Sequence, residues 1–118
     1  MENMRLPKLK FGVDGWDNSN FDKGLNLTVR RGIYWSTKVK AGDAVELTSF
    51  SGQSFGEATI DYVVTIRFCD IPDYMLKFEH EPQFRTYAGL LYGMRQAYTP
   101  VFLEEEICTL IFFRPNEK

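Results

Sequence analysis

The residues best suited to chemistry lie in one basic stretch, residues 23–40. It contains Lys23, Arg30, Arg31, Lys38 and Lys40 and no acidic residue, although the whole chain has a formal net charge of −2. A local positive field on an acidic molecule indicates a surface that holds an anionic ligand. The pattern alone equally allows a solvated basic face that binds nothing.

Apolar and polar side chains alternate within this stretch. The apolar set is Leu25, Leu27 and Val29, and the polar set is Asn26, Thr28 and Arg30. A period of two predicts a strand with one face in a core and the other presenting an amide, a hydroxyl and a guanidinium. Such a face suits a polar or anionic ligand.

A second group of candidate residues is the segment Glu79-His80-Glu81. A carboxylate from this segment could approach Thr28 if the segment lies across the mouth of the fold. A hydroxyl near a carboxylate and a lysine is either an activated nucleophile or a hydrogen-bond clamp for a base or ribose. The structural alternative is an ion pair between Glu79 or Glu81 and Arg30 or Arg85.

The sequence predicts no metal site and no cofactor. His80 is the only histidine, and the two cysteines, Cys69 and Cys108, are far apart in the chain. Both cysteines occupy apolar runs, which is typical of reduced core thiols. The spacing therefore disfavours zinc.

Composition is that of an ordinary globular domain. The chain has 118 residues, of which 44% are hydrophobic and 25% charged, enough for a single core. No stretch approaches membrane-spanning length and no apolar leader opens the chain, so we expect a cytoplasmic protein without membrane contact. We assume a monomer.

Periodicity predicts an α+β fold. Strands are expected at residues 24–30, 44–50, 55–68 and 107–113, with a short edge strand at Leu9, Phe11 and Val13. In the longest strand, even-numbered residues from 58 to 68 should share one face. Helices are expected near residues 71–78 and, capped by Thr86, at 87–98. Trp16 lies in a loop-like run, as a lid over the core or a stacking platform.

The helix capped by Thr86 should carry a buried stripe at Tyr87, Leu90, Leu91, Met94 and Tyr98. Its two glycines, Gly89 and Gly93, indicate close packing onto the sheet. With few strands and one core, a small closed or half-closed barrel is the natural architecture.

Several segments together resemble the ASCH domain of the PUA-like superfamily. They are Thr28-Val-Arg30, the run from Lys40 to Leu47, the long strand, Asp70-Ile-Pro72, the 79–81 segment and the helix ending at Tyr98. The resemblance spans residues 21–114. It implies a small mixed β-barrel with two helices at 21–118, and an irregular N-terminal segment, residues 1–20, packed on it. Of the family signature Gly-x-Lys-x-x-Glu-x-Arg, only the arginine is kept, at Arg30.

The resemblance implies binding of RNA or a modified nucleotide in a cleft beside the barrel. Phosphates would contact basic side chains, and Trp35 or Tyr34 would stack on a base, while Thr28 and Glu81 read the base or sugar. The predicted nucleic-acid-binding residues are Arg30, Arg31, Trp35, Lys38, Lys40 and Arg85.

The family also implies an alternative function. A small bacterial subgroup hydrolyses the acetyl amide on the exocyclic amine of cytidine, using a lysine, a threonine two residues before the arginine, and a glutamate. Here these would be Thr28 and Glu81 or Glu79, while the lysine position holds Leu25 and Lys23 lies nearby. The catalytic set implied is Thr28, Lys23 and Glu81. A third possibility is a protein-interaction module without a ligand.

Overall fold

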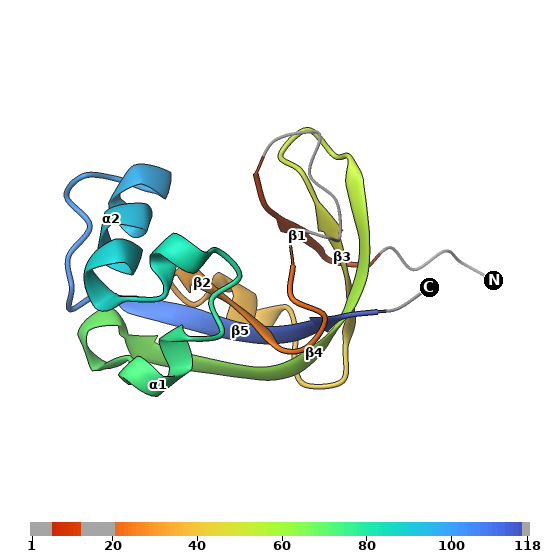
Figure 1. Ribbon diagram of the computed structural model, residues 1–118, viewed down its shortest axis with the longest axis horizontal. Helices are drawn as coiled ribbons and strands as arrows, with labels where there is room; N and C mark the ends of the chain where they lie inside the picture. Colours follow the sequence, from red (N-terminus) through yellow and green to blue (C-terminus); the bar gives the residue numbers. More distant parts are fainter. Residues whose placement is uncertain (1–5, 13–20, 117–118) are drawn as a thin grey trace.

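The computed structural model describes residues 6–12 and 21–116, and within them five strands form one curled sheet (Figure 1). The strands are β1 (Lys8–Lys10), β2 (Asn26–Arg31), β3 (Ala44–Thr48), β4 (Ser54–Arg67) and β5 (Ile107–Pro115). Their order in the sheet is β1-β3-β4-β5-β2. Because β1 and β2 are the two edges, the sheet is a half-barrel that stays open between them. This confirms the predicted α+β class and the small half-closed barrel.

Pairing is antiparallel except at one edge. β4 pairs with β3 and β5, and β2 pairs with β5, all antiparallel, whereas β1 runs parallel to β3. The edge strand predicted at Leu9, Phe11 and Val13 is present in part as β1, which contains Leu9 and ends one residue before Phe11. Val13 and Trp16, which also carried predictions, lie outside the described residues.

Two apolar clusters lie on opposite faces of the sheet. The barrel cluster fills the concave face: Leu9, Phe11, Phe21, Val39, Val45, Leu47, Phe55, Ala58, Ile60, Ile111 and Phe113. The helix cluster lies between the other face and the helices: Leu27, Val29, Phe68, Ile71, Leu76, Leu90, Met94, Phe102, Cys108, Leu110 and Phe112. Alternate residues of β5 thus enter different clusters, as a period of two requires.

A bulge in β4 corrects the prediction of one continuous face. Ile60 pairs with Phe113, but Tyr62 pairs with Phe112, which leaves Asp61 as an extra residue. An extra residue exchanges the two faces of a strand. Ile60 is accordingly 1% exposed in the barrel cluster, whereas Tyr62 is 50% exposed on the opposite face.

The helices are shorter than the two α-helices that the sequence predicts, but their positions agree. A 3₁₀ turn at Phe68–Asp70 precedes α1 (Asp73–Leu76), whose N-cap is Pro72. A second 3₁₀ turn at Pro82–Phe84 leads into α2 (Tyr87–Ala97). The predicted cap is confirmed, because the side chain of Thr86 accepts a hydrogen bond from the amide of Gly89.

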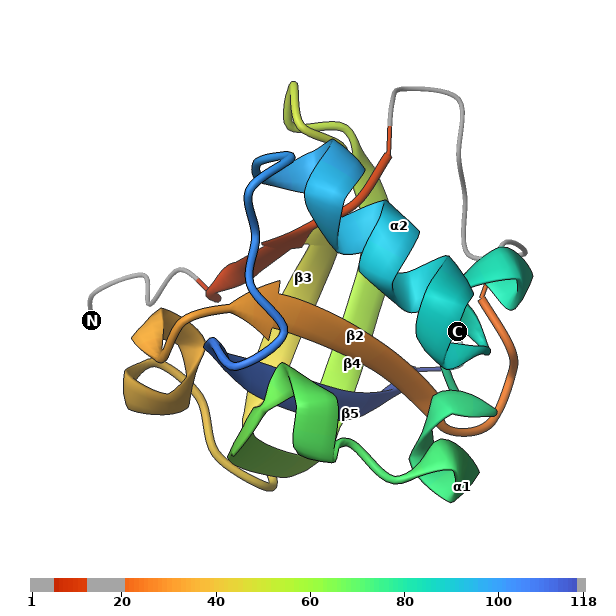
Figure 2. The ribbon, with the colours of Figure 1, turned by 90° about the vertical axis from the view of Figure 1, so that its left-hand side faces the viewer.

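The glycines of α2 pack on a turn and not, as predicted, on the sheet. A Cβ at Gly89 would lie 2.1 Å from the carbonyl oxygen of Gln83, and one at Gly93 would lie 2.7 Å from the ring of Phe84. The missing side chains therefore let α2 dock on the 3₁₀ turn that precedes it. Figure 2 shows α2 on the side of the molecule facing the viewer.

The two cysteines differ in exposure. Cys108 is buried, but Cys69 is exposed and is not a core thiol as predicted. Burial raises the pKa of Cys108 to about 11.

Within the described residues, no helix has the length and apolar character needed to cross a membrane.

Candidate functional site

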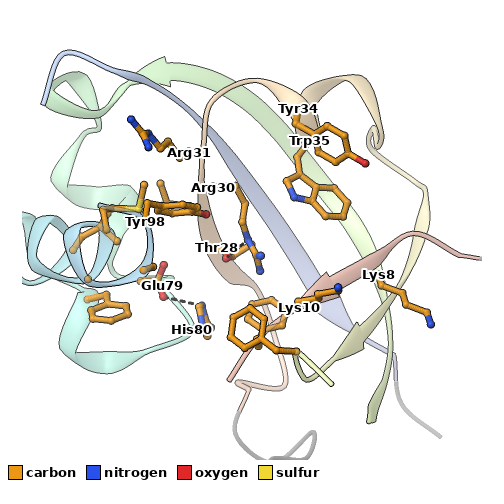
Figure 3. Close-up of a pocket in the computed structure, with 18 of the residues that line it drawn as sticks. Lys8, Lys10, Thr28, Arg30, Arg31, Tyr34, Trp35, Glu79, His80 and Tyr98 are labelled. Atoms are coloured by element: carbon orange, nitrogen blue, oxygen red, sulfur yellow. Dashed lines mark hydrogen bonds and ion pairs between the residues drawn. The ribbon is translucent and has the colours of Figure 1, made fainter. Parts of the chain in front are cut away.

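A cleft of about 780 Å³ occupies the open side of the half-barrel. In Figure 3 its walls come from β1, β2, the segment around Glu79 and the helix that ends near Tyr98. A 3₁₀ helix at Tyr34–Thr37, which follows β2, closes one end. Segments that are distant in sequence therefore meet here, because the sheet does not close between its edge strands.

The polar face predicted for β2 exists, but most of it is buried. Thr28 is 3% exposed and Asn26 is fully buried, with its amide donating to the backbone oxygens of Asp22 and Gly24 at 2.9 and 3.2 Å. The prediction of a solvent-facing strand is corrected here. The sheet curls, so the polar face becomes the concave inner face, and of these three residues Thr28 and Arg30 line the cleft whereas Asn26 does not.

Thr28 and Arg30 are coupled at the floor of the cleft. Nε of Arg30 donates a hydrogen bond to Oγ1 of Thr28 at 3.1 Å, and the guanidinium lies 4.8 Å from the centre of the Phe11 ring. Burial lowers the pKa of Arg30, while Tyr98 and Glu79 raise it. An arginine remains protonated nonetheless, so a poorly hydrated positive charge faces the cleft.

Glu79 is held opposite Arg30 by backbone hydrogen bonds to β2. The amide of Leu27 donates to the carbonyl of Phe78 at 2.6 Å, and the amide of His80 donates to the carbonyl of Leu27 at 3.0 Å. The bridge fixes residues 78–80 against the strand. As a result the side chain of Glu79 lines the cleft, although the residue as a whole is only 1% exposed.

His80 orients the carboxylate of Glu79. Nδ1 of His80 lies 2.7 Å from Oε1 of Glu79 and 3.1 Å from the carbonyl oxygen of Leu27. Both neighbours are acceptors, so Nδ1 carries the ring proton. The ring also meets Phe11 edge to face, with centroids 4.8 Å apart. These contacts give a rigid carboxylate beside a fixed imidazole.

Aromatic side chains stand at the mouth of the cleft. Tyr34 and Trp35 meet edge to face with centroids 5.7 Å apart, and Nζ of Lys38 lies 5.2 Å from the centre of the Tyr34 ring. Tyr98 and Phe50 also line the cleft and are 43% and 68% exposed. Exposed rings around a concave site offer stacking surfaces.

Positive charge surrounds this mouth. Lys8 and Lys10 project from β1 and Lys38 follows the 3₁₀ helix. Arg31 is held by Glu106, with Nε 2.7 Å from Oε1. This hydrogen bond raises the pKa of Arg31 and lowers that of Glu106. Among the described residues that line the cleft, Glu79 is the only acid.

The structure places five of the predicted site residues in the cleft and four outside it. Those that line it are Thr28, Arg30, Arg31, Trp35 and Lys38. Lys40 pairs with Asp43 at 3.4 Å, and Arg85 pairs with Asp22 at 3.2 Å while Nε of Arg85 donates to the carbonyl of Glu79 at 2.8 Å. Lys23 is exposed and Glu81 is half-buried, and neither belongs to the lining.

Leu25, at the lysine position of the resemblance, points away from the cleft. It lies one residue before β2 and packs against the helix cluster, whereas Thr28 pairs with Ile111 of the barrel cluster. Leu25 does not line the cleft.

Several cleft residues were not among those predicted. Lys8, Lys10 and Phe11 belong to the alternation Lys-Leu-Lys-Phe, which indicates an edge strand with a basic face. The sequence predictions name His80 only as part of the 79–81 segment and as a histidine that forms no metal site. Tyr98 was assigned to the buried stripe of α2, yet it lies beyond the last residue of the helix and is partly exposed.

Two solved structures share this architecture. A high-resolution crystal structure of an ASCH domain from Lactobacillus crispatus JV V101 superposes with a TM-score of 0.66 at 15% identity, covering 94% of this chain and 79% of that one. The protein has an ASCH-like fold. A crystal structure of an Enterococcus faecalis V583 protein, described by family model DUF984, superposes with a TM-score of 0.66 at 9% identity, covering 98% and 82%.

These similarities establish the ASCH-like fold and nothing about the ligand, because identity is low. No family model matches the sequence, and no curated protein matches it either.

Proposed function

We propose that the cleft of this ASCH-like domain binds single-stranded RNA or a nucleotide. The main support for the proposal is that basic and aromatic side chains surround the same concave site. Lys8, Lys10 and Lys38 border a cleft that also presents exposed rings, on a protein whose overall charge is negative. Proteins that bind single strands combine a positive groove with rings on which bases stack.

In this proposal the lysines at the mouth contact phosphates. Lys8 and Lys10 approach from β1, and Lys38 directly follows the 3₁₀ helix Tyr34–Thr37 that closes one end of the cleft. A strand of nucleic acid would follow these lysines along the mouth of the cleft. Lys38 is in cation–π contact with Tyr34, so it can place a charge beside a stacked base.

The floor of the cleft would hold a base. The guanidinium of Arg30 supplies donors and the carboxylate of Glu79 supplies acceptors, both from positions fixed by other contacts. A cleft of about 780 Å³ is in the range of sites that enclose small ligands. The base would then be the part of the ligand that is buried.

The test is a fluorescence-anisotropy titration of the protein with a short single-stranded RNA over a range of salt concentrations. Lys10→Glu should weaken binding on the order of tenfold and make the salt dependence shallower, by roughly 0.7 in slope for each lost phosphate contact. Lys77→Glu is the matched control, because Lys77 is an exposed residue at the C-terminal cap of the short helix α1 and does not line the cleft. Equal weakening by both changes would contradict the proposal.

A second candidate function is hydrolysis of an acylated pyrimidine nucleoside. The observation that favours it is that Thr28, Arg30, Glu79 and His80 all line one cleft. Water would split the amide into a free amine and a carboxylic acid. Thr28 would act as nucleophile, Glu79 would handle the proton, and Arg30 would stabilise the oxyanion.

Acetylcytidine hydrolysis, followed by chromatography of the released nucleoside, tests the second candidate. Because Thr28 accepts a hydrogen bond from Arg30 and no lysine occupies position 25, we expect absent or very slow turnover. Rapid turnover that is lost in Thr28→Ala would favour the enzyme over the binding domain. Leu25→Lys should not increase the rate, since residue 25 faces the helix cluster.

A further inference from the structure

The two carboxylate oxygens of Glu79 have different surroundings. Oε1 accepts the backbone amide of Glu81 at 3.0 Å and lies 2.7 Å from Nδ1 of His80. Within the described part of the chain, no hydrogen bond or ion pair uses Oε2. One oxygen therefore anchors the side chain, and the other is available to a ligand.

The available oxygen opens to the cleft. Only one fully enclosed polar side-chain atom among the described residues lacks a partner, and it is Oγ1 of Thr48. Oε2 of Glu79 therefore keeps some accessible surface, although the residue as a whole is only 1% exposed. Glu79 lines the cleft, and Figure 3 shows its side chain entering the cavity beside Tyr98. A nearly buried acceptor without a donor is a strong determinant of what may bind.

The carboxylate is also rigid. Three independent contacts hold the Glu79 segment: the bridge to Leu27, the donation from Nε of Arg85 to the Glu79 carbonyl, and the clamp of His80. A group held in this way discriminates between ligands, because it cannot move to suit the wrong one.

We propose that Glu79 selects the base, by accepting a hydrogen bond from the exocyclic amine of an adenine or a cytosine at the bottom of the cleft. This inference rests on the proposed function, since it assumes that a base enters the cleft. Only the tip of a ligand can reach an oxygen that is so deeply placed. Adenine and cytosine carry an amine there, whereas hypoxanthine and uracil of the same size carry a carbonyl oxygen, which a carboxylate repels.

Arg30 complements this choice. Figure 3 shows that it enters the same cavity from β2, opposite Glu79. In both adenine and cytosine a ring nitrogen that accepts hydrogen bonds is adjacent to the amine. The guanidinium can donate to that nitrogen while Glu79 accepts from the amine, and together they would fix the orientation of the base.

The experiment compares short oligouridine strands that carry one central cytidine, adenosine, inosine or uridine. Anisotropy titrations with the native protein should favour cytidine over uridine, and adenosine over inosine, by about tenfold. Glu79→Gln keeps the shape of the side chain but replaces Oε2 or Oε1 by an amide donor. It should reduce each preference below about threefold by weakening the amine-bearing strands and strengthening the others.

Two further variants locate the effect. Glu105→Gln removes the same charge from an exposed residue outside the cleft and should preserve the discrimination. Glu79→Asp keeps the charge but withdraws the oxygen, and it should reduce discrimination as well. Melting curves establish that each variant is folded before it is titrated.

Discrimination that is lost in Glu81→Gln and kept in Glu79→Gln would overturn the assignment to Glu79. Binding of all four strands with equal affinity by the native protein would overturn the inference and leave the proposed function standing. Binding of none of them would overturn both.

Discussion

Replacing Gly89 by alanine tests how α2 is seated beside the cleft. In an isolated helix this change is favourable by about 1 kcal/mol, because glycine loses more backbone entropy than alanine. Here the added Cβ would lie 2.1 Å from the carbonyl oxygen of Gln83 and 3.0 Å from Oγ1 of Thr86. The first contact is with backbone and cannot be relieved by a rotamer change.

The two effects have opposite signs and the clash is larger. Overpacking costs typically reach about 3 kcal/mol, and the short distance to the oxygen of Gln83 places this substitution at that upper end. Subtracting the gain in helix propensity leaves a net loss of about 2 kcal/mol. For a domain of this size that corresponds to a fall in melting temperature of about 8 °C.

Urea and thermal unfolding followed by circular dichroism measure this loss. Gln96→Ala is the matched control, because Gln96 is an exposed residue of the same helix and should change stability by less than about 0.5 kcal/mol. An unchanged or raised melting temperature for Gly89→Ala would refute the packing of α2 on the turn at Pro82–Phe84.

Three other changes have defined outcomes. Leu90→Ala should lower the free energy of unfolding by about 2–5 kcal/mol in urea titrations, because Leu90 is 3% exposed within the helix cluster. Arg31 lowers the pKa of Glu106, so their pairing stabilises the fold at pH values above the ordinary carboxylate pKa, and this stabilisation is lost as pH falls below about 4.5. In Arg31→Ala the free energy of unfolding should therefore fall less steeply as the pH is lowered. Burial and a hydrogen bond to Glu104 raise the pKa of Tyr87 to about 12. Its stabilising contribution is therefore present below pH 10 and is lost as pH rises towards 12. Tyr87→Phe should remove the ionisation step near pH 12 from an ultraviolet titration of the tyrosines.

Local signals in the sequence predict much of the fold. The spacing of apolar residues places α2, and Thr86 marks its start, because both depend on residues within one or two helical turns. Alternation likewise places β2, and a continuous apolar run places β5. These patterns also explain the overall agreement with a half-barrel of ASCH-like type.

Local sequence patterns do not predict the curvature of the sheet. Alternation predicts two faces for β2, but it does not say that the polar face turns inward and buries Asn26 and Thr28. The bulge at Asp61 is equally hidden, since the even-numbered residues on both sides of it remain apolar or aromatic. Both features arise from how strands pair across the sheet.

The cleft depends on contacts between distant segments. Lys8 and Lys10 reach it only because β1 pairs in parallel with β3 and becomes the edge opposite β2. The choice of Glu79 over Glu81 as the carboxylate in the cleft follows from the bridge between Leu27 and residue 79. No spacing within the 79–81 segment could have indicated that bridge.

The most direct test of the central claim is an NMR titration of the isotopically labelled protein with a short single-stranded RNA. If RNA binds in the cleft, the amide signals of Val29, Arg30, Glu79 and His80 should shift together and saturably, while those of α1 remain in place. Shifts confined to the outer face of α2 would contradict binding in the cleft. So would an absence of shifts at RNA concentrations that saturate the anisotropy titration.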